Sequence, residues 1–244
     1  MSSQPTAAII VIGNEILSGK TQDANIRYLG TQLAELGIVL QQAIVLRDDH
    51  ETIVSTVRYY SQRYTYVFTT GGIGPTHDDI TAEAVAAAFG THVEINEQAA
   101  AAIGGDRDHP RMKMAMIPAE ATLIENSVSR APGFQLKNVF VLAGVPSIAQ
   151  AMFESLRPQL RGGAAIVSAN ADVFLRESDI ARPLAGIASA NVDVEIGSYP
   201  FSREGQFGAN LVVRGTDARR VESVMKEIIE AMEAIGADVQ RHEI

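Results

Sequence analysis

The residues best suited to chemistry lie in one stretch, Thr69-Thr70-Gly71-Gly72-Ile73-Gly74-Pro75-Thr76-His77-Asp78-Asp79. Three glycines within four residues leave backbone N–H groups free, and a backbone without β-carbons can approach a phosphate closely. Asp78 and Asp79 supply hard oxygen atoms that could hold a divalent cation against that phosphate. A tight turn with two capping aspartates is the alternative, but the paired acids after a strand favour an anion-binding loop.

A second group of polar residues follows the apolar run at residues 7–12. Gly13 ends that run, and Glu15 and Ser18 come next as candidates for contacting a ligand. Asp23 could belong to the same group or could cap the helix that follows it. Ligands of open α/β sheets bind beyond the carboxyl ends of the strands, which is where this loop is expected to lie.

A third loop repeats this arrangement after the apolar run at residues 138–143. Gly144, Pro146 and Ser147 combine a strand end, a proline at the start of a helix and a serine that could contact a phosphate. Glycines in turns and prolines at helix starts are also common without any ligand. Two such loops at one edge of a sheet would form a cleft.

Alternating strands and helices are predicted to position these loops. Buried strands are expected at residues 7–12, 38–46 and 66–70, because these runs are apolar and rich in β-branched residues. Helices are expected at residues 26–36, 53–60 and 82–89, the last with Thr81 as its N-cap. Three strand–helix repeats predict an α/β fold, a mostly parallel sheet in a three-layer α/β/α arrangement.

The segment from residue 91 to residue 136 is less regular. A helix is expected at residues 96–103 and short strands at 121–124 and 133–136. Between them Met112, Met114 and Met116 alternate and are predicted to pack into the core from an extended segment. Basic side chains interleave with them at positions Arg107, His109, Arg111 and Lys113. These fit either a solvated loop, which is more usual, or contacts with an anionic ligand.

The chain is predicted to divide into two domains, residues 1–163 and residues 164–244. The second reads as a small α+β domain, with two short extended segments at 165–168 and 173–175, strands at 192–199 and 210–213, a helix at 178–187, and a long helix that Asp217 caps. It carries no Gly-x-x-Gly loop with basic flanks, so packing or dimerisation is expected of it in place of RNA binding.

Composition limits the classes of protein that this chain can represent. A net charge of −9 over 244 residues disfavours a general nucleic-acid binder. There is no cysteine, which excludes disulfides, thiolate catalysis and cysteine-bound metals. No apolar run approaches the length of a membrane span, and no basic leader precedes the first strand. We therefore expect a cytoplasmic protein with a small-molecule ligand.

Four motifs, in order, resemble the N-terminal domain of competence/damage-inducible protein A (CinA). They are Gly13-Asn14-Glu15-Ile16-Leu17-Ser18-Gly19, Thr70 to Thr81, Ala131-Pro132-Gly133-Phe134 and Ala143-Gly144-Val145-Pro146-Ser147. That domain belongs to the molybdopterin-binding (MoaB/Mog-like) superfamily, and the resemblance covers about residues 7 to 160. It implies an α/β/α domain whose glycine loop binds a phosphate or pyrophosphate, and a small KH-like module after it. The amidase domain of CinA is not matched.

The resemblance also implies which residues bind the ligand. Gly71, Gly72 and Gly74 match the superfamily's Gly-Gly-x-Gly loop, and Asp79 falls on the aspartate that assists Mg-dependent adenylyl transfer to a pterin phosphate or its reversal. The complete set of predicted ligand-binding residues is Glu15, Ser18, Thr70, Gly71, Gly72, Gly74, Pro75, Thr76, Gly144, Pro146 and Ser147. Asn14 departs from the aspartate that many relatives carry at its position.

For the CinA branch and a related domain fused to FAD synthetase, the resemblance implies metal-dependent hydrolysis of the pyrophosphate bond in ADP-ribose or FAD. Asp78 and Asp79 would then hold Mg²⁺, Mn²⁺ or Co²⁺, with Glu15 as a further candidate ligand, and His77 would be a catalytic acid or base or an orienting neighbour. A molybdopterin-binding protein without hydrolytic activity is the alternative, and an interaction protein with a vestigial cleft is the third. Related domains often self-associate, so a homo-oligomer is expected.

Overall fold

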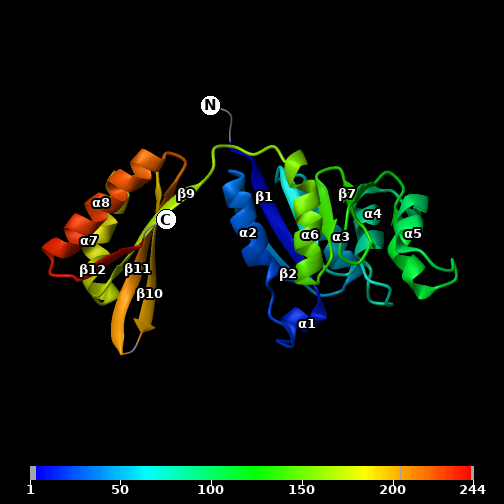
Figure 1. Cartoon of the computed structure of the whole chain (residues 1–244), viewed down its shortest axis with the longest axis horizontal. Helices are drawn as coiled ribbons and strands as arrows, with labels where there is room; N and C mark the ends of the chain where they lie inside the picture. The colour runs from blue at the N-terminus through cyan, green and yellow to red at the C-terminus, as the bar shows by residue number, and fades with distance from the viewer. Residues whose placement is uncertain (1–3, 204, 243–244) are drawn as a thin grey trace. The chain divides into compact units, whose positions relative to one another are not determined.

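The computed structural model describes residues 4–203 and 205–242 and divides the chain into two compact units. The first unit is Met1–Gly163 and the second is Ala164–Ile244. Each unit has a hydrophobic core of its own. The loops singled out in the sequence all belong to the first unit (Figure 1).

The first unit is built on a six-stranded sheet in the order β2-β1-β3-β8-β7-β6. Strands β1 (Thr6–Ile12), β2 (Val39–Leu46), β3 (Tyr66–Thr70) and β8 (Val139–Leu142) are parallel, and β7 (Gly133–Leu136) and β6 (Thr122–Ile124) run antiparallel at one edge. Residues 7–12 of β1 are buried throughout, as expected for a strand covered on both faces. The predicted mostly parallel sheet is confirmed.

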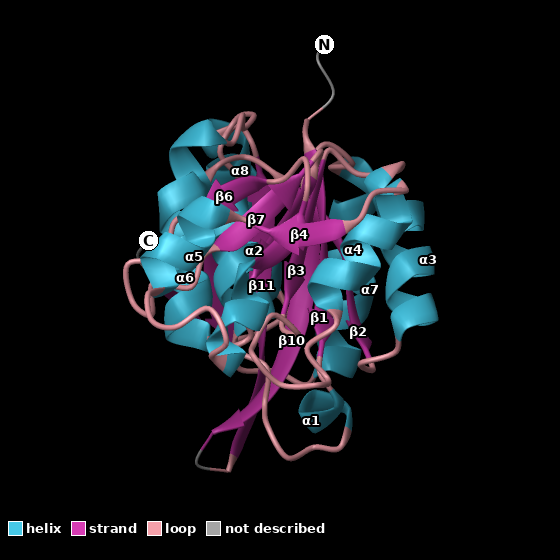
Figure 2. Cartoon of the chain, turned by 90° about the vertical axis from the view of Figure 1, so that its right-hand side faces the viewer, coloured by secondary structure: helices cyan, strands magenta, loops and turns pink. Residues whose placement is uncertain are grey.

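Helices cover both faces of this sheet (Figure 2). On one face, α2 (Asn25–Glu35) and α6 (Pro146–Leu156) pack against Phe68 and Phe140. On the other, α3 (His50–Ser61), α4 (Thr81–Phe89) and α5 (Glu97–Ile103) pack against the opposite side chains of β1, β3 and β8. The three-layer prediction is therefore confirmed. The side chain of Asp49 caps α3 and that of Asn96 caps α5.

Three local predictions for the first unit were wrong. The polar loop after β1 contains one helical turn, α1 (Asn14–Leu17). Thr81 is not the N-cap of α4 but its first residue, because its hydroxyl donates to the carbonyl oxygen of Gly71 instead of capping the helix. The methionine segment is extended only at Met116, because Met112 and Met114 belong to a 3₁₀ helix, η1 (Pro110–Ala115), of which Met112 is buried.

The remaining short elements of the first unit lie outside the six-stranded sheet. Strands β4 (Val93–Ile95) and β5 (Met116–Pro118) form a separate antiparallel pair. A short 3₁₀ helix, η2 (Arg157–Gln159), follows α6. Because β5 continues directly from η1, the basic residues of η1 are attached to a strand pair beside the main sheet.

The second unit is a four-stranded antiparallel sheet in the order β10-β11-β9-β12 with two helices. Its elements are β9 (Val167–Val173), α7 (Glu177–Ala190), β10 (Glu195–Arg203), β11 (Gln206–Gly215), α8 (Ala218–Ala234) and β12 (Val239–His242). The predicted α+β class is confirmed, and Asp217 caps α8 as expected. Two details differ, since β9 is one continuous strand and β12 was not predicted.

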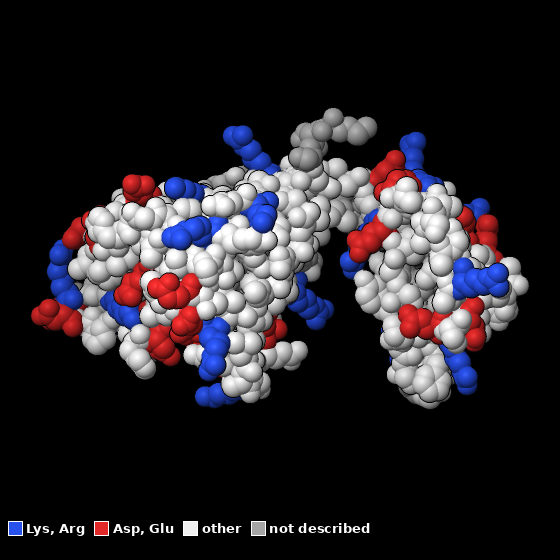
Figure 3. Space-filling model, turned by 180° about the vertical axis from the view of Figure 1, so that it is seen from behind, with Lys and Arg blue, Asp and Glu red and all other residues white. Residues whose placement is uncertain are grey.

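Within the described residues, the structure contains no helix long and apolar enough to cross a membrane. Basic and acidic side chains are interspersed over the face drawn in Figure 3. The chain as a whole has a net charge of −9, and its acidic side chains are mixed with basic ones on this face. A nucleic-acid-binding surface, in contrast, concentrates Lys and Arg on one face or along one element.

Candidate functional site

The three predicted loops meet at one edge of the sheet because they follow neighbouring parallel strands. Gly13 follows β1, Gly71 follows β3 and Gly144 follows β8. The last two loops are in close contact, since a β-carbon placed on Gly144 would lie 3.3 Å from the Cα of Gly71. The backbone N–H of Gly71 donates to the carbonyl of Leu142, which extends the ladder between β3 and β8 into the loop.

The first two glycines of the loop are required by the protein's own packing. Gly71 and Gly72 have positive φ angles of 102° and 67°. A β-carbon on Gly71 would overlap the carbonyl oxygen of Ile12, and one on Gly72 would overlap the hydroxyl of Thr81. From the sequence, these glycines were expected to let a phosphate approach the backbone closely. In the structure their missing β-carbons make room for β1 and α4.

The loop still offers donors to an anion. Within residues 4–203 and 205–242, the backbone N–H groups of Gly72, Ile73 and Gly74 donate to no protein acceptor. All three belong to the same loop as Asp78 and Asp79. Successive unpaired N–H groups in a turn form a concavity suited to an anion, so the anion-binding prediction rests here on three consecutive donors.

Thr76 ties the two aspartates of the loop together. Its hydroxyl lies 2.5 Å from Oδ2 of Asp79 and 2.6 Å from Oδ1 of Asp78, and its N–H donates to Oδ2 of Asp79 at 2.8 Å. One hydroxyl proton cannot be donated to both carboxylates at once, so this arrangement favours additional positive charge near them. The Thr76 hydroxyl is also the main reason that the pKa of Asp78 is lowered, so Asp78 is ionised at neutral pH.

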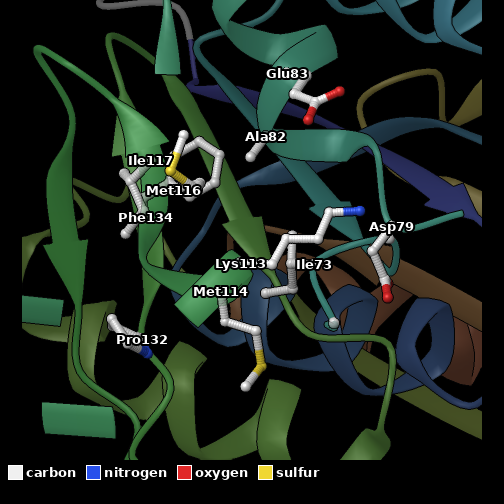
Figure 4. A pocket seen from close by; sticks show the side chains of 12 residues that line it. Ile73, Asp79, Ala82, Glu83, Lys113, Met114, Met116, Ile117, Pro132 and Phe134 are labelled. Atoms are coloured by element: carbon white, nitrogen blue, oxygen red, sulfur yellow. The ribbon is translucent and has the colours of Figure 1, made fainter. Parts of the chain in front are cut away.

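The two aspartates line different cavities. Asp79 lines a narrow pocket of about 20 Å³, where Met116, Ile117 and Phe134 lie on the opposite wall (Figure 4). Asp78 lines an open depression of about 640 Å³. We call these the narrow pocket and the depression below.

The depression also contains two of the predicted ligand-binding residues, Glu15 and Ser18. The Glu15 carboxylate folds back toward Gly13, and the Ser18 hydroxyl donates to the carbonyl of Glu15 at 3.1 Å. Asp23 does not line the depression. Its Oδ1 accepts the N–H of Ile26 at 2.8 Å, so the helix-capping interpretation of Asp23 is confirmed.

Sequence reasoning missed three charged residues of the depression, Lys20, Arg47 and Asp48. Oδ2 of Asp48 accepts the backbone N–H of Asn14 at 2.9 Å, which fixes the start of α1. The signal that would have found Asp48 is topological, because β2 is parallel to β1 and its carboxyl end must reach the same edge.

Of the remaining predicted residues, His77 is the least engaged with the site. Its side chain is 98% exposed and its Nδ1 lies 3.9 Å from Oδ1 of Asp78. Pro75 is exposed beside it. Thr70 is buried, and its hydroxyl has no hydrogen-bond partner in the described part of the chain. Thr70 therefore lies behind the loop and not at its surface.

The third loop is adjacent to the site but lines neither the narrow pocket nor the depression. Pro146 occupies the first turn of α6, and Ser147 is exposed beside it. The carbonyl of Gly144 accepts a hydrogen bond of 2.9 Å from Nδ2 of Asn25, which is buried at the start of α2. Sequence reasoning also missed Asn25, and its role is to hold this loop against α2.

The donors present suit a hard divalent cation of the Mg²⁺ type. Across the residues that the structure describes, no group of three or more His, Cys, Asp or Glu side chains is arranged to hold a metal. Mg²⁺ typically binds through one or two carboxylates and completes its shell with water and substrate phosphates, which Asp78 and Asp79 allow. A preformed three-ligand site of the catalytic zinc type does not fit.

Comparison with protein-family models matches both units. A model described as "probable molybdopterin binding domain" matches residues 8–162, and one described as "FAD synthase, middle domain" matches residues 165–239. The first match contains all the loops described above. The second covers most of the second unit, for which the sequence alone had indicated only a KH-like module.

Individual relatives agree with these matches. A protein of Aeropyrum pernix is 34% identical over 98% of this chain and 96% of its own length. A probable FAD synthase of Caenorhabditis elegans is 31% identical over 95% of this chain, which spans about half (51%) of that relative. The crystal structure of the protein CinA from Thermoplasma acidophilum is 34% identical, with a TM-score of 0.61 over 65% of this chain and 99% of that one.

Proposed function

Since the chain belongs to the molybdopterin-binding domain family and is CinA-like, we propose that its first unit is a divalent-metal-dependent pyrophosphatase that cleaves FAD- or ADP-ribose-like dinucleotides. The match of the second unit to the FAD synthase middle domain, and the similarity to a probable FAD synthase, favour a flavin dinucleotide among these ligands.

The observation that carries the proposal is the Asp78–Thr76–Asp79 arrangement next to three unpaired backbone N–H groups. The N–H groups of Gly72, Ile73 and Gly74 would bind phosphate oxygens, and the carboxylates of Asp78 and Asp79 would hold the divalent cation. The depression of about 640 Å³ has the size of a small-molecule site.

The reaction is the addition of water across a phosphoanhydride bond, which yields two monophosphates. Oxygen of water forms a bond to one phosphorus while the bridging oxygen leaves with the other, and the water protons go to the products and solvent. The chemistry that Mg²⁺, Mn²⁺ or Co²⁺ supplies when bound is polarisation of the phosphate and a lower pKa of water. The chain's own contribution is to orient the two phosphates and to place Asp78, ionised at neutral pH, beside them.

Chromatographic detection of AMP and FMN tests the proposal. The wild-type protein is incubated with FAD, ADP-ribose, NAD and an adenylylated pterin, each with Mg²⁺, Mn²⁺ or Co²⁺, and compared with Asp79→Asn. Because the variant removes the charge at the cation site, we expect turnover to fall at least about 100-fold. His77→Ala is the matched comparison, and its exposed side chain predicts a loss of less than about tenfold.

Absence of AMP with every substrate and metal would refute the pyrophosphatase. Saturable binding of molybdopterin without turnover would then favour the pterin-binding protein, since the family model describes a molybdopterin binding domain. Full activity of Asp79→Asn would refute the role given to the loop carboxylates even if the wild type hydrolyses FAD.

A further inference from the structure

Cationic side chains lie on both sides of the Asp78–Asp79 pair. Lys113 lines the narrow pocket together with Asp79, whereas Lys20 and Arg47 line the depression together with Asp78. The two cavities therefore share the same short acidic segment, and each has its own source of positive charge. This distribution is not accounted for by the loop motif, because none of the three cations belongs to it.

Lys113 reaches the loop from outside the sheet. It belongs to η1, and its ammonium donates a hydrogen bond to the carbonyl oxygen of Thr76, the residue that contacts both aspartates. An ammonium carries three protons, and that carbonyl is its only acceptor within residues 4–203 and 205–242. Two donors thus remain for a ligand, beside the unpaired N–H groups of Gly72 and Gly74 that line the same pocket.

We infer that the two phosphates of the substrate straddle Asp78 and Asp79, with an oxygen of one phosphate bound by Lys113 at the narrow pocket and the other phosphate bound on the Arg47 side, in the depression. This inference rests on the proposed function, and it deepens it by assigning a position to each phosphate and a selective role to Lys113. It places the scissile phosphoanhydride over the two carboxylates.

The sizes of the cavities decide which part of a ligand each of them can hold. The narrow pocket, at about 20 Å³, has room for about one water-sized group, such as a phosphate oxygen, and none for a purine, flavin or pterin ring. The depression, at about 640 Å³, can hold a nucleoside. A nucleoside must therefore bind in the depression, and only an oxygen of the second phosphate can enter the narrow pocket to reach Lys113. The organic group that the second phosphate of a dinucleotide carries stays outside the narrow pocket.

Lys113 should consequently distinguish ligands with two phosphates from ligands with one. A nucleoside monophosphate places its single phosphate on the Arg47 side and does not touch Lys113. A nucleoside diphosphate engages both sides. Loss of Lys113 therefore weakens only the second ligand, whereas loss of Arg47 weakens both.

Calorimetric titration with AMP and with α,β-methylene-ADP, whose P–C–P bridge cannot be hydrolysed, tests this in Mg²⁺ buffer. In Lys113→Gln we expect the Kd for α,β-methylene-ADP to rise about tenfold, the typical effect of one hydrogen bond to a charged group, and the Kd for AMP to change less than twofold. In Arg47→Gln both should rise. Arg111→Gln removes the same charge from the same 3₁₀ helix, where the exposed Arg111 does not line the pocket, and should change neither.

Lys113→Arg separates binding from folding, because it keeps the positive charge and should retain most of the preference for the diphosphate. Equal weakening of both ligands by Lys113→Gln, or no weakening of either, would overturn the inference, as would a wild-type protein that binds neither probe. FAD turnover by the wild type is measured separately. A Lys113-dependent preference without turnover would support this two-phosphate site and refute the hydrolase. Turnover without the preference would support the hydrolase and refute the two-phosphate site.

Discussion

The hydroxyl of Thr81 holds the glycine loop in place, and its removal has a predictable cost. Thr81 is fully buried at the start of α4, and its Oγ1 donates to the carbonyl oxygen of Gly71 at 2.9 Å. Thr81→Val preserves the shape of the side chain and leaves that buried carbonyl without its partner. The expected loss in the free energy of unfolding is about 1–3 kcal/mol. Helix propensity contributes little, because Thr and Val rank closely.

Thr69 is the matched control. It is fully buried in β3, and its hydroxyl has no hydrogen-bond partner in the described part of the chain. Thr69→Val makes the same chemical change but removes a buried polar group that gains nothing from burial, so stability should stay constant or rise by up to about 1 kcal/mol. The free energies of unfolding of the two variants should therefore differ by about 1–4 kcal/mol, with Thr81→Val the less stable.

Urea unfolding followed by tyrosine fluorescence measures this difference in the first unit. Five of the six tyrosines lie in that unit, and the chain has no tryptophan, so the signal reports mainly on its unfolding. With an m value of about 2 kcal/mol/M, a loss of 2 kcal/mol lowers the urea midpoint of Thr81→Val by about 1 M. Midpoints that coincide for Thr81→Val and Thr69→Val would show that the Thr81–Gly71 hydrogen bond contributes nothing to stability, and the reasoning about the loop would be wrong.

Two further predictions concern the loop and the second unit. Gly72→Ala adds a β-carbon where φ is 67° and where the Thr81 hydroxyl already lies. We therefore expect the free energy of unfolding, measured in the same urea assay, to fall by at least about 1 kcal/mol. Wild-type stability of this variant would contradict the packing role of Gly72. In the second unit, burial alone would raise the pKa of Asp172, but hydrogen bonds from Asn210, His242 and Arg203 outweigh it and lower the pKa. A lowered pKa means that this carboxylate stabilises the fold above the unfolded-state pKa, about 4, and that the stabilisation is lost as the pH falls below it. The protection factors of the β9 amides against hydrogen exchange should accordingly fall below about pH 4 more steeply in the wild type than in Asp172→Asn, and equal slopes would exclude the contribution of Asp172.

The alternation of apolar runs with helical periodicity was sufficient to predict the parallel sheet and its covering helices. A run such as residues 7–12 has one stable environment, between two layers of helices, and β1 is buried accordingly. The order of the loops along the chain also placed Glu15, Asp78 and Gly144 at a common edge, because parallel strands end on the same side. Asp217 could be identified as a cap because capping is a local interaction, whereas for Asp23 the sequence left a cap and a ligand contact as alternatives and the structure decided between them.

Predictions from local sequence patterns were wrong where a residue distant in the sequence contacts the same side chain. Thr81 has the residue type of an N-cap, but the carbonyl of Gly71, ten residues earlier, takes its hydroxyl. The alternating methionines suggested a strand, but the segment coils into η1 and places Met112 in the core. Short elements have little propensity of their own, and tertiary contacts therefore decide their conformation.

By itself the sequence determined the fold class, the family motifs and the loop that carries the paired aspartates, since these follow from the periodicity of side chains and from residue types within about ten positions. Only the tertiary structure decided what each residue of the loop does. It assigned Gly71 and Gly72 to packing against Ile12 and Thr81, placed Asp78 and Asp79 in different cavities, and brought Lys113 to Thr76 across 37 positions of the chain. Contacts of that sequence separation depend on how the layers pack, and no local pattern encodes them.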